Sequence, residues 1–195
     1  MKSPREIEIK LRVENPRVLK RRLAECGFVV VERRHFESNA VFDFRNSRLR
    51  RSRSLLRLRT ERNRHLLTFK GPPQASGSYK IRPEIETEVK DEAGARQVLE
   101  ALGLHSSFRY EKYRTAYAEK KHRKSVDQPQ LLYDETPIGQ YVELEGPEEW
   151  IDRVARRLGY EKRDYITASY AALHQDYCRK HGTRAGHMVF PKNKS

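Results

Sequence analysis

Short segments in which charged and apolar residues alternate strictly run through most of this chain. In the first of them Glu6, Glu8 and Lys10 occupy every second position, with Ile7 and Ile9 between them. A period of two is that of a β-strand, so each such segment predicts a strand with one charged face and one aliphatic face. The same alternation recurs over residues 55–59, 67–70, 81–89, 110–114 and 142–145.

Four other stretches carry apolar residues at helical spacing, between and after these strands. The predicted helices begin at Asn15, Asp91, Pro147 and Asp164, and the first three end before a glycine. Amphipathic helices need an apolar surface on which to pack, and the aliphatic faces of the strands offer one. We therefore expect the helices to cover the aliphatic side of a curled sheet.

The charged faces of the strands then line a shared interior. Several strands carry like charges two positions apart, and such neighbours, about 7 Å from one another, repel unless ions or a charged ligand lie between them. Carboxylates bind hard divalent cations, whereas Arg and Lys bind phosphate oxygens. The pattern predicts an α+β fold whose barrel-like interior holds a phosphate chain together with Mg²⁺ or Mn²⁺.

Composition narrows the class of ligand without choosing one. The 195 residues carry a formal net charge of +14, which favours an anionic partner. A basic cluster over residues 45–53, with Phe42 and Phe44 nearby, could bind an RNA backbone, but no helix-turn-helix, RRM or zinc-knuckle pattern supports nucleic acid as the partner. Two distant cysteines, no signal peptide and no membrane-length apolar run predict a cytoplasmic protein without a membrane partner.

An ordered set of motifs resembles the CYTH superfamily, also called the triphosphate tunnel metalloenzymes, and is closest to its class IV adenylyl cyclase branch. The motifs are Glu6-x-Glu8-x-Lys10, Leu56-Arg57-Leu58-Arg59, Leu67-Thr68-Phe69-Lys70-Gly71-Pro72, Arg82-x-Glu84-x-Glu86, Lys112-x-Arg114, and Asp134 through Gly139 followed by Glu143-x-Glu145. The resemblance implies a closed, eight-stranded antiparallel β-barrel tunnel with a charged lumen and helices outside. It implies a divalent metal, Mg²⁺ or Mn²⁺, as cofactor.

The resemblance also implies roles for individual residues. Glu6, Glu8, Glu143 and Glu145 are expected to hold the metal and to be catalytic, with support from Glu86, Glu88 or Asp134. The phosphates are expected to bind Lys10, Arg57, Arg59, Lys70, Arg82 and Arg114. Two questions stay open: which of Glu84, Glu86 and Glu88 faces a metal, and whether Lys80 and Lys112 reach phosphate.

Two reactions fit this set of residues. The first is conversion of ATP to cyclic AMP and pyrophosphate; the second is hydrolysis of an inorganic or organic triphosphate, such as tripolyphosphate, thiamine triphosphate or a nucleoside triphosphate. Ala168 stands where many relatives carry a basic residue, which weighs against a mechanism of the thiamine triphosphatase kind. An RNA-binding or polyphosphate-binding protein without catalysis is the alternative of a different class.

The domain prediction places the tunnel domain over residues 1–181. Residues 182–195 are polar and lack periodicity, so we expect a disordered tail whose removal matters little. A monomer or a homodimer is expected.

Overall fold

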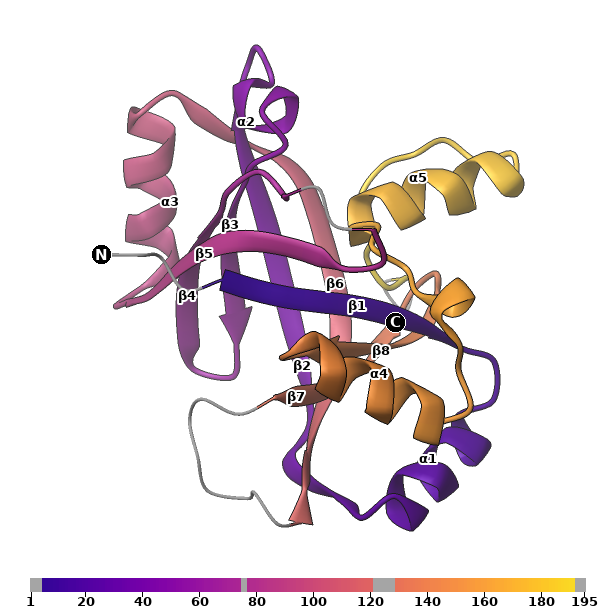
Figure 1. Cartoon of the computed structure of the whole chain (residues 1–195). Helices are drawn as coiled ribbons and strands as arrows, with labels where there is room; N and C mark the ends of the chain where they lie inside the picture. The colour runs from indigo at the N-terminus through magenta and orange to yellow at the C-terminus, as the bar shows by residue number, and fades with distance from the viewer. Residues whose placement is uncertain (1–4, 75–76, 121–128, 192–195) are drawn as a thin grey trace.

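Eight antiparallel strands close into one barrel. The computed structural model describes residues 5–74, 77–120 and 129–191. Around the barrel the strands follow the order β1-β5-β4-β3-β2-β6-β7-β8, and Figure 1 shows them crossing one another around a common interior. The strands are β1 Arg5–Val13, β2 Phe28–Phe44, β3 Leu55–Glu61, β4 Arg64–Lys70, β5 Lys80–Val89, β6 Leu104–Glu119, β7 Gln130–Thr136 and β8 Gly139–Glu145. The predicted closed α+β barrel is confirmed.

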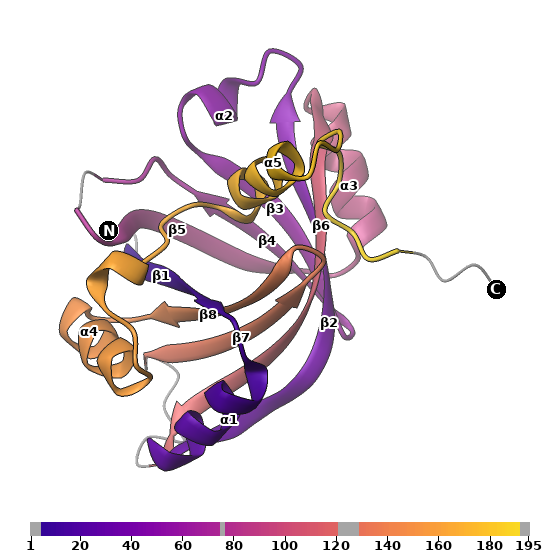
Figure 2. The same cartoon turned by 90° about the vertical axis from the view of Figure 1, so that its right-hand side faces the viewer.

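In the described part of the chain, five α-helices accompany the barrel. They are α1 Pro16–Glu25, α2 Arg48–Arg51, α3 Glu92–Ala101, α4 Glu148–Arg157 and α5 Tyr170–Lys180, and a 3₁₀ helix, η2, spans Lys162–Asp164. Asn15 caps α1 by accepting from two backbone amides, and Asp91 caps α3. Figures 1 and 2 show α2 and α5 toward one end of the barrel and α1 at the other.

The last helix begins later than the sequence predicts. The helix expected from Asp164 starts at Tyr170, where the Ser169 side chain accepts a hydrogen bond from the amide of Ala172. Ile166 instead forms an antiparallel bridge with Lys10, with hydrogen bonds of 2.8 and 2.9 Å in the two directions. A tertiary backbone pairing outweighs the helical spacing of the apolar residues in this segment.

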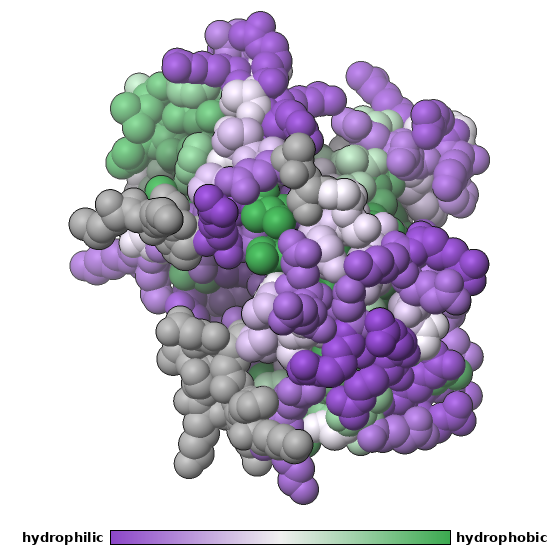
Figure 3. Space-filling view, viewed as in Figure 1, coloured by the Kyte–Doolittle hydropathy of each residue, from purple (hydrophilic) through white to green (hydrophobic). Residues whose placement is uncertain are grey.

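The face of the molecule seen in Figure 3 is mostly hydrophilic, with an apolar patch over α3. Val98 and Leu102 are 60% and 66% exposed there. Within the part of the chain that the structure describes, no helix combines the length and the hydrophobicity needed to span a membrane.

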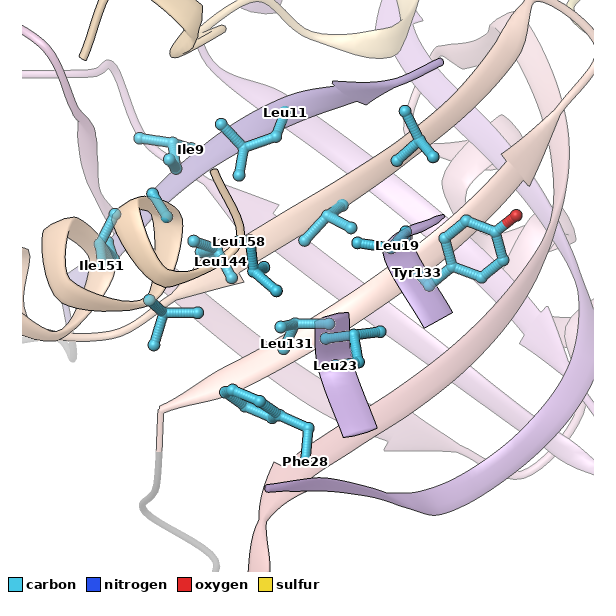
Figure 4. Packing of buried hydrophobic residues seen from close by; sticks show 14 of the residues in the cluster. Ile9, Leu11, Leu19, Leu23, Phe28, Leu131, Tyr133, Leu144, Ile151 and Leu158 are labelled. Carbon is cyan, nitrogen blue, oxygen red and sulfur yellow. The ribbon is translucent and has the colours of Figure 1, made fainter. Parts of the chain in front are cut away.

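The aliphatic face of β1 points outward under the helices, as predicted, whereas Phe69 of β4 and Ile85 of β5 are 37% and 57% exposed. Ile9 and Leu11 of β1 are fully buried and belong to one cluster with Leu23 of α1, Ile151 of α4 and Leu158, the C-cap of α4. Figure 4 shows these side chains meeting between the sheet and the two helices. Because burying a large aliphatic side chain contributes about 1.5–3 kcal/mol, this packing fixes which face of β1 turns toward the interior.

The C-terminal segment is docked, so the prediction of a disordered tail from residue 182 is wrong for the part that the structure describes. Met188 is completely buried, and its backbone pairs with β6 through hydrogen bonds to Arg109 and Glu111. β7 pairs with β6 from Tyr113 to Tyr117, which leaves the preceding part of that β6 edge to another partner. Residues 187–190, which we call the strap, take this place; residues 192–195 lie outside the described residues.

Candidate active site

A charged cavity of about 230 Å³ occupies the barrel interior. Eight cationic side chains line it, Lys10, Arg57, Arg59, Lys70, Lys80, Arg82, Lys112 and Arg114, together with six acidic ones, Glu6, Glu8, Glu84, Glu86, Glu143 and Glu145. They come from β1, β3, β4, β5, β6 and β8, so the parity of each strand brings its charged face to the same place. Of the residues predicted for the site, Asp134 and Glu88 are missing from this described lining.

Three of these carboxylates form a compact cluster. Ligand atoms of Glu6, Glu8 and Glu145 lie within 4.8 Å of one another. Glu8 of β1 stands directly opposite Glu145 of β8 in the strand register, and like charges in directly opposed positions destabilise a sheet. One buried oxygen of Glu6, Oε2, accepts no hydrogen bond from the described residues. The cluster therefore presents oxygen ligands whose charges are incompletely matched.

The pKa values of two members of the cluster, Glu6 and Glu145, show the same lack of positive charge. Burial, followed by repulsion from Glu8, raises the pKa of Glu6 to about 8, against the opposing effect of Lys70. Burial likewise raises the pKa of Glu145, with Glu143 and Glu8 adding to it. A divalent cation would stabilise both carboxylates in the ionised form, and carboxylate oxygens are the donors that Mg²⁺ and Mn²⁺ prefer. Glu6, Glu8 and Glu145 thus fit the expected metal.

Lysines lie against this cluster in the structure. Lys70 donates to Glu6 at 2.5 Å, and Lys80 donates to Glu8 at 2.6 Å, with Lys10 3.4 Å from the same carboxylate. Burial opposes ionisation of Glu8, but Lys10 and Lys80 outweigh it and hold its pKa well below the usual value. A cation bound to the carboxylates would weaken these pairs and leave the ammonium groups to phosphate oxygens.

Glu143 belongs to a second ionic group on the β6–β8 side of the cavity. It lies 3.1 Å from Lys10 and accepts a short hydrogen bond from Arg114. Burial opposes ionisation of Glu143, yet Lys10, Lys112 and Arg114 together lower its pKa. Glu143 is therefore partnered by cations, outside the Glu6–Glu8–Glu145 cluster.

Asp134 anchors this second group from outside the cavity. It is fully buried and accepts from Lys112 at 2.9 Å, from two nitrogens of Arg114 at 2.7 and 2.8 Å, and from the hydroxyl of Tyr170 at 2.7 Å. These donors occupy its oxygens in the structure, and its expected metal-supporting role stays a prediction. Asp134 orients two of the cations that face the cavity.

The three acidic residues of β5 have different surroundings. Glu84 lies 3.0 Å from Lys70, next to the cluster. Glu86 accepts from Thr68 at 2.7 Å and lies 3.4 Å from Arg59, so it steadies the arginines of β3 and does not join the cluster. Glu88 pairs with Arg64 at 3.1 Å, and both side chains are more than half exposed.

Arg57 shows how the phosphate-binding cations are held. Its side chain donates to the hydroxyls of Tyr110 at 3.3 Å and Thr68 at 3.2 Å. The nitrogen Nε is buried and has no hydrogen-bond partner within the described residues. Glu86 lies 3.5 Å from the same guanidinium, and an anion in the cavity would give the buried Nε the partner that it lacks here.

Sequence reasoning missed several polar residues of the interior. Glu37 of β2 is fully buried, 3.4 Å from Lys112 and 3.6 Å from Arg114, and Asn39 is 1% exposed with no side-chain hydrogen bond within the described residues. Tyr110 and Tyr170 supply hydroxyls to Arg57 and Asp134. The sequence around Glu37 and Asn39 does not predict that these two side chains face the interior, because Ser38 and Ala40 do not form a clear aliphatic face on the other side of the strand.

Comparison with known protein families agrees with this architecture. The sequence pattern of the CYTH domain matches residues 4–170, most of the chain. The chain belongs to the CYTH family. Among curated proteins, a relative from Methanocaldococcus jannaschii, named "Putative adenylate cyclase MJ0240", is 28% identical over 140 residues, which cover 72% of this chain and 75% of the relative.

Solved structures share the CYTH fold. One described as a "putative adenylate cyclase" from Vibrio parahaemolyticus superposes with a TM-score of 0.74 at 18% identity, over 88% of this chain and 98% of the other. The PH1012 protein from Pyrococcus horikoshii superposes with a TM-score of 0.69 at 25% identity, over 86% of this chain and 98% of the other. A Hippeastrum protein, HpAC1, superposes with a TM-score of 0.61 at 21% identity, over 92% of this chain and 97% of the other.

Proposed function

We propose that this CYTH protein is a divalent-metal-dependent enzyme that processes a triphosphate, and that its reaction is conversion of ATP to cyclic AMP and pyrophosphate. The observation that supports this most is the joint presence, in one cavity, of eight cations and of the Glu6–Glu8–Glu145 cluster. A triphosphate with its metal needs both kinds of group at once. The Methanocaldococcus relative, named as a putative adenylate cyclase, favours cyclisation.

The chain's own residues would bind and orient the phosphates. Arg57, Arg82 and Lys70 are each less than 10% exposed and face the cavity. Because this space is poorly solvated, the electrostatic attraction between their charges and a phosphate is strong. Asp134 holds Arg114 and Lys112 in place without occupying the cavity. In the cyclisation the ribose 3′-oxygen bonds to the α-phosphorus, its proton is lost, and the bond from that phosphorus to the departing pyrophosphate breaks.

The metal would be held by Glu6, Glu8 and Glu145. Bound there, it would neutralise phosphate charge and lower the barrier to displacement at phosphorus. The predicted metal role of Glu143 finds less support, because Lys10 and Arg114 already pair with it.

Hydrolysis of a triphosphate is the second candidate. HpAC1 from Hippeastrum is described as having a dominant triphosphatase activity despite its cyclase name. The same cations grip the phosphates whether the nucleophile is a ribose hydroxyl or water, so the products have to distinguish the two reactions. RNA or polyphosphate binding without catalysis is the third possibility, and it predicts binding without products.

The test is a parallel assay of ATP and tripolyphosphate with Mg²⁺ or Mn²⁺, in which cyclic AMP, pyrophosphate and orthophosphate are measured. We expect metal-dependent product formation from the wild type and a loss of at least about 100-fold in Glu8→Gln, in line with removal of a strong electrostatic contact in an active site. Glu88→Gln, on the exposed part of β5, is the matched control and should retain activity. Turnover in Glu8→Gln equal to that of the control would remove Glu8 from the metal site.

A further inference from the structure

An imidazole and two carboxylates meet at the end of the barrel away from α2. Glu61 is the last residue of β3, the strand that follows α2, and it stands directly opposite Glu37 of β2 in the strand register. Figure 1 shows the turn between β3 and β4 at that end. His35, two positions before Glu37, turns to the same side of β2. Ligand atoms of the three side chains lie within 4.8 Å of one another, and we call these three residues the rim group.

The two carboxylates of the rim group repel one another. Glu37 and Glu61 are directly opposed, and like charges in such positions destabilise a sheet. Glu37 is completely buried, yet neither of its oxygens accepts a hydrogen bond from the described residues. Because a buried carboxylate is costly unless it is paired and hydrogen-bonded, this arrangement indicates that a further positive group belongs between the two carboxylates.

The cations near Glu37 bind it only loosely. Lys112, Arg114 and Arg59 lie 3.4, 3.6 and 3.8 Å from its oxygens, whereas hydrogen bonds between charged groups are usually about 2.7–2.9 Å long. Lys112 and Arg114 make contacts of that length with Asp134, at 2.7 to 2.9 Å. Asp134 therefore holds these two cations more closely than Glu37 does.

The arginines near Glu61 are also shared with other carboxylates. Arg59 lies 3.5 Å from Glu61 and 3.4 Å from Glu86. Arg64 lies 3.9 Å from Glu61 but 3.1 Å from Glu88. Glu61, like Glu37, is thus left with long ion pairs and keeps oxygen lone pairs for another ligand.

His35 is oriented as metal-binding histidines are. Its Nδ1 lies 3.1 Å from the carbonyl oxygen of Arg33, which can only accept, so Nδ1 carries the hydrogen. Arg62 lies at longer distances from that carbonyl and from Nδ1, 3.4 and 3.5 Å. In the neutral imidazole the lone pair of Nε2 then faces Glu37 and Glu61. A metal-binding histidine typically donates from its other ring nitrogen to a carbonyl or carboxylate in this way.

The spacing of these atoms suits a transition-metal ion. Zn²⁺ binds nitrogen and oxygen at about 2.0–2.2 Å, so two ligands of a tetrahedral ion lie about 3.4 Å apart. Nε2 of His35 lies 3.7 Å from Glu37 and 3.8 Å from Glu61, too far for hydrogen bonds but close to this separation. An imidazole in the ligand set favours Zn²⁺ over Mg²⁺, which prefers oxygen alone. A proton on Nε2 is the competing positive group, because Glu37, above all, raises the pKa of this imidazole.

We propose that the rim group binds a divalent transition-metal ion, for which Zn²⁺ is the probe, and that this ion strengthens the binding of phosphates in the charged cavity. The site is separate from the Glu6–Glu8–Glu145 cluster, because no member of the rim group belongs to the described lining of that cavity. Three protein ligands leave the ion a fourth position for water.

The effect on phosphate binding follows from shared cations. Arg59, Lys112 and Arg114 line the charged cavity and are also the cations nearest to Glu37. An ion that neutralises Glu37 and Glu61 leaves more of their positive charge to an anion in the cavity. By linkage, a bound anion then strengthens the binding of the ion by the same factor. This coupling rests on the proposed triphosphate chemistry, whereas the metal site itself does not.

The experiment is a calorimetric titration with Zn²⁺ in excess Mg²⁺. His35→Gln and Glu61→Gln each remove one ligand, and Glu61, 14% exposed at its side chain, is the least buried of the three. His105→Gln is the matched control, because His105 is an exposed histidine outside the rim group. Glu8→Gln weakens the Glu6–Glu8–Glu145 cluster and leaves the rim group intact.

We expect the wild type, His105→Gln and Glu8→Gln to bind one equivalent of Zn²⁺ with the same affinity. His35→Gln and Glu61→Gln should bind it at least about 10-fold more weakly, since even the loss of a partner behind a metal ligand costs about 10- to 100-fold. Equal affinity in His35→Gln, Glu61→Gln and His105→Gln would overturn the site. Loss of Zn²⁺ binding in Glu8→Gln, with retention in His35→Gln, would place the ion in the Glu6–Glu8–Glu145 cluster and overturn it as well.

A titration with tripolyphosphate in Mg²⁺, at equal free Zn²⁺ and without Zn²⁺, tests the coupling. Zn²⁺ should tighten binding to the wild type by at least about fivefold, the lower end of usual couplings between sites, and should have no effect in His35→Gln. An equal effect in both proteins would refute the coupling, because Zn²⁺ would then act on the anion or at another site. If the wild type neither binds tripolyphosphate nor forms products from ATP, the proposed enzymatic function fails, and the Zn²⁺ titration still decides the rim group.

Discussion

Replacement of Asp134 by asparagine tests whether Asp134 stabilises the fold by holding Lys112 and Arg114 in place or instead supports the metal. The Asp134 carboxylate is fully buried and accepts four hydrogen bonds, from Lys112, from two nitrogens of Arg114 and from Tyr170. The substitution Asp134→Asn keeps the shape of the side chain but removes its charge, and it turns an amide nitrogen toward groups that are themselves donors. Two buried cations would then lose their nearest counter-charge.

The expected loss of stability follows from this environment. Removing one partner of a buried, hydrogen-bonded ion pair typically costs about 3–5 kcal/mol. Glu143 and Glu37 remain within 4 Å of the same two cations and offset part of the loss, so we expect the lower end, about 3 kcal/mol. With a urea m-value of about 2 kcal/mol/M, the unfolding midpoint should fall by about 1.5 M.

Urea unfolding, followed by circular dichroism, measures this shift. Asp176→Asn is the control: Asp176 pairs with Arg179 at 2.9 Å, and both side chains are more than half exposed, so its loss should change stability by less than about 0.5 kcal/mol. If Asp134→Asn lost no more stability than Asp176→Asn, the stabilising role of Asp134 would be refuted. If it kept its stability and instead lost affinity for Mn²⁺, Asp134 would be the metal-supporting residue that the family resemblance implies.

Two further predictions concern the strap and the pH dependence of stability. Met188→Ala should cost about 2–5 kcal/mol, because truncating a fully buried methionine removes apolar contacts and leaves a cavity; a change below about 1 kcal/mol in urea unfolding would show that the strap is not docked. His35 should make the protein more stable at low pH, because the neighbouring Glu37 carboxylate, above all, raises the pKa of its imidazole. That contribution is fully present below the unfolded-state pKa, near 6.5, and is lost as the pH rises through the folded-state value. His35→Gln should remove this component from the free energy of unfolding measured between pH 5 and 9, and an identical pH profile for the variant would contradict it.

The sequence determined the two faces of most strands. A side chain two positions along a strand returns to the same face, so the alternation of Glu6, Glu8 and Lys10 with aliphatic residues already assigned one face to charge. The helical patterns supplied the cover for the other face. Together with the ordered motifs, these patterns were enough to predict the closed barrel and to gather Arg57, Arg82 and their partners in its interior.

Only the tertiary structure decided which interior residues meet. Parity fixes the side of a strand but not its offset against its neighbours. The register that sets Glu8 opposite Glu145, and the burial of Asp134 behind Arg114, therefore follow from strand pairing around the whole barrel. The strap depends on tertiary structure for the same reason: its own residues have no periodicity, and it docks because β7 leaves part of the β6 edge unpaired. Backbone groups at such an edge need hydrogen-bond partners whatever the side chains are. The pattern of side chains in the sequence therefore does not predict which strand edge stays unpaired.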